Sequence, residues 1–196
     1  QNILTAEQDE LWKEEIKNLL GIEYKNDIRG NLQVRNYYQV ANAEAVFAIA
    51  TLNNNQTGVS GGTNTAVQLG ISINKPVYVW DINSEQWYKF NGISQHFEKT
   101  ETPILTKDFA GIGTRDIENY SVPDKVNPNK WVPRKEYVGD QKAAAAKQAI
   151  TDVYQKTKDS ILGETKVNEI EDPKIQSVPR KVEVLGKLEI GQYVKY

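Results

Sequence analysis

The stretch from residue 44 to residue 81 constrains the fold of this chain more than any other. It contains two short apolar runs, EAVFAIA and KPVYVWD, each as long as a buried strand, with a segment of helical composition between them. Two consecutive glycines, Gly61 and Gly62, open that segment. This order predicts a β-loop-α-β unit, in which the loop leaves the carboxyl end of the first strand.

The glycine pair is a candidate anion-binding loop. Glycine allows backbone N–H groups to approach a ligand that a Cβ would hold off. The N–H groups of the first helical turn, residues 63–66, have no acceptor within the helix and lie at the positive end of its dipole. We therefore expect a phosphate group to bind here, at Gly61, Gly62, Thr63, Asn64 and Thr65. The alternative is that the pair forms an ordinary turn.

The segment SGGTNTAVQ, followed by KPVYVWD, resembles the P-G-G-x-G-T-x-x-E motif and K-P-V strand of the Lonely Guy (LOG) phosphoribohydrolases. Upstream, QVRNYYQVANAEAVFAIA resembles the R-K-x-x-M helix of that family. The resemblance implies that Arg35, the glycine pair and Thr65 contact phosphate. Two residues depart from the motif: Asn64 replaces a glycine, and Gln68 replaces the glutamate implicated in cleaving the N-glycosidic bond. The match therefore indicates the wider SLOG superfamily of Rossmann-like nucleotide-binding domains rather than LOG activity.

A second glycine-rich stretch, TPILTKDFAGIGTRDIENY, resembles the A-G-I-G-S-R strand and loop of DprA-like SLOG domains. The resemblance implies that a nucleotide or phosphate meets Gly111, Gly113, Thr114 and Arg115. In ordinary SLOG domains this strand comes first, whereas here it follows KPVYVWD, as in an uncharacterised, circularly permuted family frequent in phages and their hosts. The S-G-G-A-x-G-A-D loop upstream in that family is missing from this chain.

Other side chains extend the candidate site. Asp81 ends the KPVYVWD strand, where it could accept hydrogen bonds from a ribose hydroxyl or, alternatively, cap a turn. Arg35 could bind the anion or remain a solvated charge on its helix. The polar run from Asn53 to Thr57 is interpreted as a mobile loop at the mouth of the site.

The fold class that follows is α/β, a Rossmann-like parallel sheet with strands at 44–50, 77–81 and about 108–112 as neighbours, flanked by helices. We expect helices at 5–20, with Thr5 and Gln8 as a capping box and Gly21 as its stop, at about 30–43, and from Asp140 to about Leu162, ended by Gly163. INSEQWYKFNG predicts a hairpin-like excursion, and the proline-containing stretch 120–139 an insertion without a long helix.

Domain boundaries are expected after residue 163: a SLOG-like domain at 1–163 and a C-terminal extension at 164–196, whose alternating VEVLGKLEIGQYVKY predicts a β-hairpin joined near Gly186. Such a hairpin is marginal alone, so we expect it to dock on the domain or on a partner chain, in a homo-oligomer or with another protein.

Composition limits the partners. Charged residues are 26% of the chain and the net charge is −2, which disfavours nucleic acid. There is no cysteine and His96 is the one histidine, so we expect neither a disulfide nor a cysteine- or histidine-based metal site, and no cofactor. No apolar run is long enough to cross a membrane, and no signal peptide opens the sequence, so we expect a cytoplasmic protein, or one in the virion if a phage encodes it. The lack of methionine at position 1 indicates that Gln1 is not the translational start.

Three functions are compatible with these observations. The first is binding or sensing of a nucleotide-derived, phosphate-bearing ligand, such as an ADP-ribose or a nucleoside phosphate. The second is LOG-like hydrolysis of an N-glycosidic bond. Gln68 disfavours this function, because a carboxamide cannot take a proton from water. Hydrolysis would then need Asp81, Asp108 or Asp116 as a substitute carboxylate. The third is a phage structural or assembly protein that has kept the fold. Whether the chain is an enzyme stays open at this point.

Overall fold

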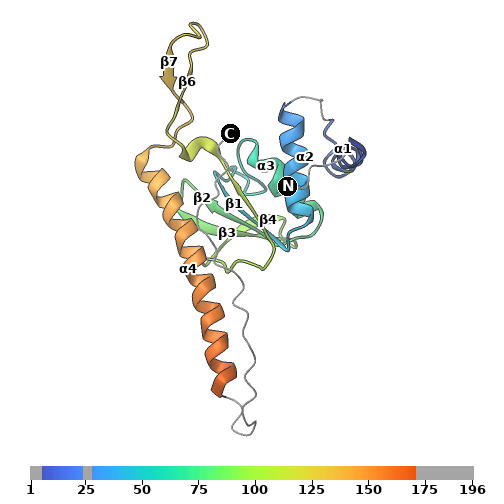
Figure 1. Cartoon of the computed structure of the whole chain (residues 1–196), viewed down its shortest axis with the longest axis vertical. Helices are drawn as coiled ribbons and strands as arrows, with labels where there is room; N and C mark the ends of the chain where they lie inside the picture. The colour runs from blue at the N-terminus through green and yellow to red at the C-terminus, as the bar shows by residue number, and fades with distance from the viewer. Residues whose placement is uncertain (1–5, 24–27, 171–196) are drawn as a thin grey trace. The chain divides into compact units, whose positions relative to one another are not determined.

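The computed structural model describes residues 6–23 and 28–170. Its largest feature is a five-stranded mixed sheet with the strand order β4-β3-β2-β1-β5 (Figure 1). The strands are β1 (Ala45–Ala50), β2 (Val77–Asp81), β3 (Gln86–Asn91), β4 (His96–Thr100) and β5 (Phe109–Gly113). β1 pairs in parallel with both β2 and β5, whereas β3 and β4 extend the sheet as an antiparallel hairpin. The predicted α/β class and the three neighbouring parallel strands are confirmed, but the sheet is mixed rather than parallel throughout. Of the hairpin, the predicted stretch INSEQWYKFNG holds only β3, and β4 lies beyond it.

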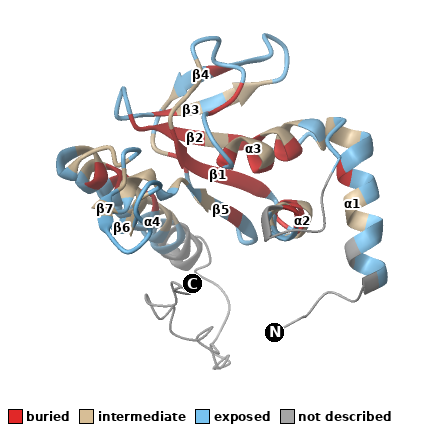
Figure 2. Cartoon of the chain, turned by 90° about the horizontal axis from the view of Figure 1, so that it is seen from above, coloured by how far each residue is buried: buried red, intermediate tan, exposed pale blue. Residues whose placement is uncertain are grey.

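β1 is buried along its whole length, which explains its uninterrupted apolar sequence. On one face of the sheet, α2 (Ile28–Ala41) and α3 (Thr63–Ser72) pack against the parallel strands, and α1 (Ala6–Leu20) packs on these two helices (Figure 2). α2 contributes the buried side chains of Val34, Tyr37 and Val40. Trp12 of α1 is half-buried and stacks on Tyr38, with the ring centroids 4.9 Å apart.

On the opposite face of the sheet, the first half of α4 (Asp140–Ile170) packs against the strands (Figure 2). Ala146, Ala149 and Val153 of this helix form a second apolar cluster with Ile49, Trp80 and Trp87 of the sheet. The helix begins at the predicted Asp140. The predicted stop at Gly163 is wrong, because the helix continues to Ile170. Glycine costs a helix interior only about 1 kcal/mol, so it marks an end reliably only when the chain also turns there.

In chain order, a short 3-10 helix, η1 (Arg115–Ile117), and a two-stranded antiparallel ribbon come between β5 and α4. The ribbon extends away from the sheet (Figure 1). The ribbon strands are β6 (Ser121–Pro123) and β7 (Trp131–Pro133). Each ends in a proline, which lacks the N–H that a longer ladder needs. Residues 120–139 therefore hold no long helix, as predicted.

Several predictions concern chain ends. Gly21 follows α1 with φ +66° and donates its N–H to the Lys17 carbonyl at 2.8 Å, which confirms the predicted stop. Thr5 of the predicted capping box and the predicted hairpin within 171–196 lie outside the described residues. None of the helices within the described ranges combines the length and apolar composition that a bilayer crossing requires.

Candidate functional site

Three predicted segments meet at the carboxyl end of β1. Ser60, just before the glycine pair, donates its N–H to the Thr51 carbonyl at 2.8 Å. Thr114 donates its N–H to the Ile49 carbonyl at 3.0 Å. The Asp81 carboxylate accepts the Leu52 N–H at 2.9 Å. The glycine loop, the segment around Arg115 and the end of β2 therefore start from one edge of the sheet.

The N-terminus of α3 is open. Gly61 has φ +76°, a left-handed conformation that favours glycine, and Gly62 is the N-cap residue, with no side chain capping the helix. A Cβ at either glycine would have no atom within 4 Å apart from those of its chain neighbours, and both residues are exposed. Thr63 is buried and Thr65 half-buried, and the first turn holds no acidic residue. The N–H groups of Asn64 and Thr65, which were expected to lack an acceptor, donate to the carbonyls of Gly61 and Gly62 at 3.2 and 3.3 Å. Within the described residues, no backbone carbonyl accepts from the N–H groups of Gly62 and Thr63, which lie at the positive end of the helix.

Two side chains of α3 hold the loop that leads to these glycines by hydrogen bonds. The Asn64 side chain accepts the Val59 N–H at 3.0 Å, and Gln68 donates its amide to the Thr57 carbonyl at 2.9 Å. Gly58 lies against both side chains, since a Cβ there would come within 2.5 Å of Asn64 Oδ1 and 2.8 Å of Gln68 Nε2. The loop is a hydrogen-bonded turn. Within residues 53–57, the Thr57 N–H donates to Asn53 Oδ1 at 3.0 Å and the Gln56 N–H to the Asn53 carbonyl at 3.0 Å. That this loop is mobile stays a prediction.

Asp81 is buried, and protein groups already occupy both of its carboxylate oxygens. One oxygen accepts the Leu52 N–H, and the other accepts the Ser84 N–H at 2.9 Å and the Ser84 hydroxyl at 2.7 Å. These contacts join the end of β1 to the turn after β2. The turn-capping alternative therefore describes this side chain, rather than an acceptor free for a ribose hydroxyl.

The remaining predicted residues are placed less uniformly. Gly111 lies inside β5, two residues before its carboxyl end, and Gly113 ends the strand; both are exposed. Thr114 caps η1 by accepting the Asp116 N–H at 3.3 Å. Arg115 is exposed at the carboxyl edge. Arg35 is exposed on α2, and the three hydrogen bonds that gather the other segments do not involve it.

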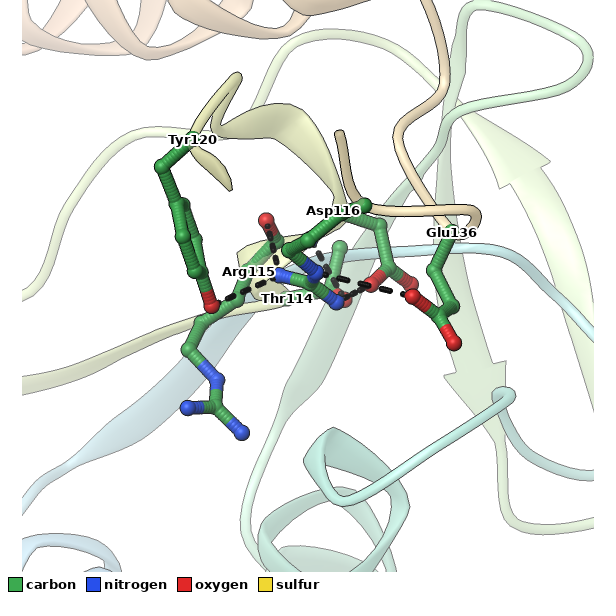
Figure 3. Close-up of polar contacts among 6 residues, drawn as sticks. Thr114, Arg115, Asp116, Tyr120 and Glu136 are labelled. Carbon is green, nitrogen blue, oxygen red and sulfur yellow. Dashed lines mark hydrogen bonds and ion pairs between the residues drawn. The ribbon is translucent and has the colours of Figure 1, made fainter. Parts of the chain in front are cut away.

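The side chain of Arg134 contacts the segment around η1, in which Figure 3 labels its partners Arg115, Asp116 and Tyr120. Its guanidinium donates to the Arg115 carbonyl at 2.9 Å and to the Tyr120 hydroxyl at 3.0 Å, and it forms an ion pair with Asp116 at 2.8 Å. The Arg134 side chain is 11% exposed. The Arg115 side chain extends away from this cluster (Figure 3). The cluster therefore fixes the backbone of Arg115 and leaves its charged group outside.

Sequence reasoning missed Arg134. It lies 19 positions from the carbonyl that it contacts, in a stretch of mixed charges with no periodicity to single it out. Asp116, which the sequence offered as a substitute carboxylate for hydrolysis, is paired with it. The planar guanidinium group of arginine can donate to several acceptors at once. Its role here can be recognised only when the fold has brought those acceptors together.

Two shallow hollows lie away from the glycine pair. One, of about 300 Å³, is lined by α2 and the start of β5, including Gln39, Asn42 and Phe109. The other, of about 910 Å³, lies between α4 and the strands β2 to β4 and includes Lys99, Asp152 and Lys156. Within residues 6–23 and 28–170, no cluster of three or more histidine, aspartate or glutamate side chains is arranged to hold a metal.

Comparison of the chain with protein-family models, with curated proteins and with solved structures gives no match. The fold and the contacts at the carboxyl edge therefore carry the functional interpretation.

Proposed function

We propose that this chain binds a phosphate-bearing, nucleotide-derived ligand, of the ADP-ribose or nucleoside phosphate type, at the N-terminus of α3. The observation that carries the proposal is the uncapped helix start, where Gly61 and Gly62 leave the backbone uncrowded and no acidic side chain opposes an anion. An anion there would accept hydrogen bonds from the N–H groups of Gly62 and Thr63, which donate to no backbone carbonyl of the described residues, in the favourable field of the helix dipole.

Arg115 supplies the complementary charge in this proposal. Thr114 donates to the Ile49 carbonyl in β1, and Ser60 donates to the carbonyl of Thr51, the residue just after β1. The Arg115 segment and the glycine loop therefore both begin at the carboxyl end of β1. The Arg134 cluster fixes the Arg115 backbone, which lowers the entropy cost of using its side chain as a ligand. Arg35 is a second candidate from α2.

The chain order of the sheet supports the SLOG-like part of the proposal. β5 follows the β3–β4 hairpin in sequence, yet it lies beside β1. A glycine-containing strand in this place fits the permuted order that the resemblance to DprA-like domains implies. The proposed domain is thus a permuted SLOG-like Rossmannoid.

Binding without efficient cleavage is the form of the activity that we propose. A LOG-like hydrolase needs a carboxylate at position 68, and Gln68 instead uses its amide N–H to hold the Thr57 carbonyl. Asp81 and Asp116, two of the three substitutes, are engaged with protein groups. General acid or base help is typically worth 10² to 10⁴ in rate, so a site without it would turn over slowly.

The test is mass spectrometry of small molecules released by denaturing the purified native protein, followed by calorimetric titration with inorganic phosphate, AMP, ADP-ribose and NAD. We expect a phosphate-bearing compound to be released, and a nucleotide to bind more tightly than inorganic phosphate. Absence of binding by all four compounds, to protein shown to be free of ligand, would refute the proposal. Base release at about 1 s⁻¹ or faster would favour the hydrolase instead.

A further inference from the structure

The strand β5 forms one end of the sheet, between α2 and α4 (Figure 2). Successive residues of β1 direct their backbone groups to opposite neighbours. The Ala50 carbonyl accepts from the Ile82 N–H, on the side of β2, and the Ile49 carbonyl accepts from the Thr114 N–H, on the side of β5. The same alternation along β5 directs the backbone groups of Ala110 and Ile112 to β1. The N–H and C=O groups of Phe109, Gly111 and Gly113 therefore point outward.

These outward groups are open. Within the described residues, no hydrogen bond is formed by the outward backbone groups of Phe109, Gly111 or Gly113. All three residues are exposed, Phe109 to 38%. Native proteins protect such an edge with charges, prolines or bulges, and the strand FAGIG has none of these. An unprotected edge of this kind is suited to accept another strand.

We propose that β5 pairs antiparallel with β5 of a second copy of this chain, about a twofold axis at Gly111. This register pairs Phe109 with Gly113, Ala110 with Ile112, and Gly111 with its own counterpart. In it, each outward-pointing residue meets another outward-pointing residue, so every open N–H on one copy faces an open C=O on the other. The two sheets become one continuous sheet, and the contact closes on itself.

Side-chain sizes fit the same register. The Phe109 ring lies opposite Gly113, where the absence of a Cβ leaves room for it, and aromatic side chains cover edge glycines favourably. On the other face, Ile112 lies opposite Ala110, beside the hollow that α2 and the start of β5 form. At the axis, two glycines meet without a Cβ between them. Each large residue is therefore opposite a small one.

Neighbouring groups set the strength of the contact. Phe109 makes an edge contact with Tyr154 of α4, with centroids 6.4 Å apart, and Tyr154 is 47% exposed, so apolar surface flanks the new ladder. Lys107 and Arg115, both exposed, come opposite each other just beyond the ladder. These like charges oppose association, and salt screens them. We expect a reversible dimer that tightens as ionic strength rises.

Sedimentation of the full chain over a range of concentrations, combined with amide exchange by NMR, tests the pairing. The Gly111 amide should exchange more slowly as the protein is concentrated, while the Ala110 amide, already bonded to β1, should not change. A chain that stays monomeric at millimolar concentration, or a dimer in which the Gly111 amide remains unprotected, would overturn the proposal.

Substitutions at the axis make the test specific. Gly111→Pro removes an N–H that points outward, so the monomer should keep its circular dichroism while the dimer is lost. Gly111→Lys and Gly111→Glu each place like charges opposite one another and should raise the dimer Kd, by roughly twofold to fivefold. An equimolar mixture of the two should form a heterodimer tighter than either homodimer. A mixture that associates no better than its components would reject the twofold axis at Gly111.

Discussion

Gln68 donates a hydrogen bond from its side-chain amide to the carbonyl oxygen of Thr57, 2.9 Å away, and a weaker one to Asn64 Oδ1 at 3.4 Å. The residue that stands where a hydrolase would place a carboxylate therefore holds the glycine loop in shape. This gives position 68 a role that a carboxylate cannot fill, because both of its neighbours are acceptors.

Replacement of Gln68 by glutamate should accordingly weaken the loop. Gln68→Glu sets a carboxylate against two acceptor oxygens, and we expect a loss of about 1 kcal/mol in the free energy of unfolding, without gain of turnover. Urea unfolding and a chromatographic assay of base release measure the two effects. Gln33→Glu, on α2, controls for the added charge. Turnover created by Gln68→Glu would show that the loop tolerates a carboxylate and that the site retains the rest of the hydrolytic machinery.

Charge at the start of α3 should separate folding from binding. Gly62 has φ −66° and open space around its missing Cβ, so it accepts a side chain. Gly62→Asp should stabilise the helix by about 0.3–1 kcal/mol through the dipole, yet repel a phosphate. Gly62→Asn has the same shape without the charge and should retain more of the binding. Calorimetry with whichever nucleotide binds the parent compares them, and equal affinities for the two variants would contradict an anion site.

Arg134 should matter for the segment that presents Arg115. Arg134→Lys keeps the charge but cannot reach the Arg115 carbonyl, Tyr120 and Asp116 together, and we expect a loss of about 1–2 kcal/mol. Exchange of the Val138 amide, which donates to the Asp116 carbonyl at 2.9 Å, reports this locally. Lys135→Ala changes an exposed neighbour and should leave that exchange as it is. Unaltered Val138 exchange in Arg134→Lys would mean that the cluster does not fix the segment.

Two helical glycines should respond oppositely to alanine. A Cβ at Gly70 of α3 would come within 2.9 Å of Val46 Cγ2 and of Val77 Cγ2, so Gly70→Ala should cost about 1–3 kcal/mol by overpacking. A Cβ at Gly163 of α4 meets no atom within 4 Å, so Gly163→Ala should add about 0.5–1 kcal/mol of helix stability. Thermal unfolding of both variants decides the matter. The same sign of change in both would contradict the close packing of α3 on the sheet.

Tyr37 should make stability depend on pH in the alkaline range. Burial, aided by nearby Glu15, raises the pKa of Tyr37 from its ordinary value of 10.0 to about 12. Because the folded state holds the proton more tightly, this contribution is complete below pH 10 and is lost as the pH rises towards 12. Tyr37→Phe should therefore lose less stability than the parent between those values. Unfolding measured at pH 9, 10, 11 and 12 gives the comparison, and parallel curves would show that Tyr37 is not shielded from water.

The elements predicted most successfully depend on local pattern. The runs that become β1, β2 and β5 are short, apolar and separated by turn residues, and such runs have few structures open to them. That these strands are neighbours was predicted from the alternation of short apolar strands with amphipathic helices, whereas the central place of β1 was not predicted. The prediction that α4 ends at Gly163 was wrong, because a glycine alone does not end a helix when the residues around it continue the helical conformation. The hydrogen-bond partners of Asp81 and Arg134 include residues far from them in sequence. Folding brings these partners together, so the sequence alone does not reveal what either side chain contacts.

The pairing of β1 with β5 also affects how the chain folds during synthesis. Ala45 is in register with Phe109, and 109 − 45 gives a separation of 64 residues. At a translation rate of about 5–20 residues per second, β5 is synthesised roughly 3–13 s after β1. During that interval an apolar strand that is wholly buried in the finished protein has one side unpaired. Nascent chains should therefore be most prone to misassociate, and most dependent on chaperones, just before β5 leaves the ribosome.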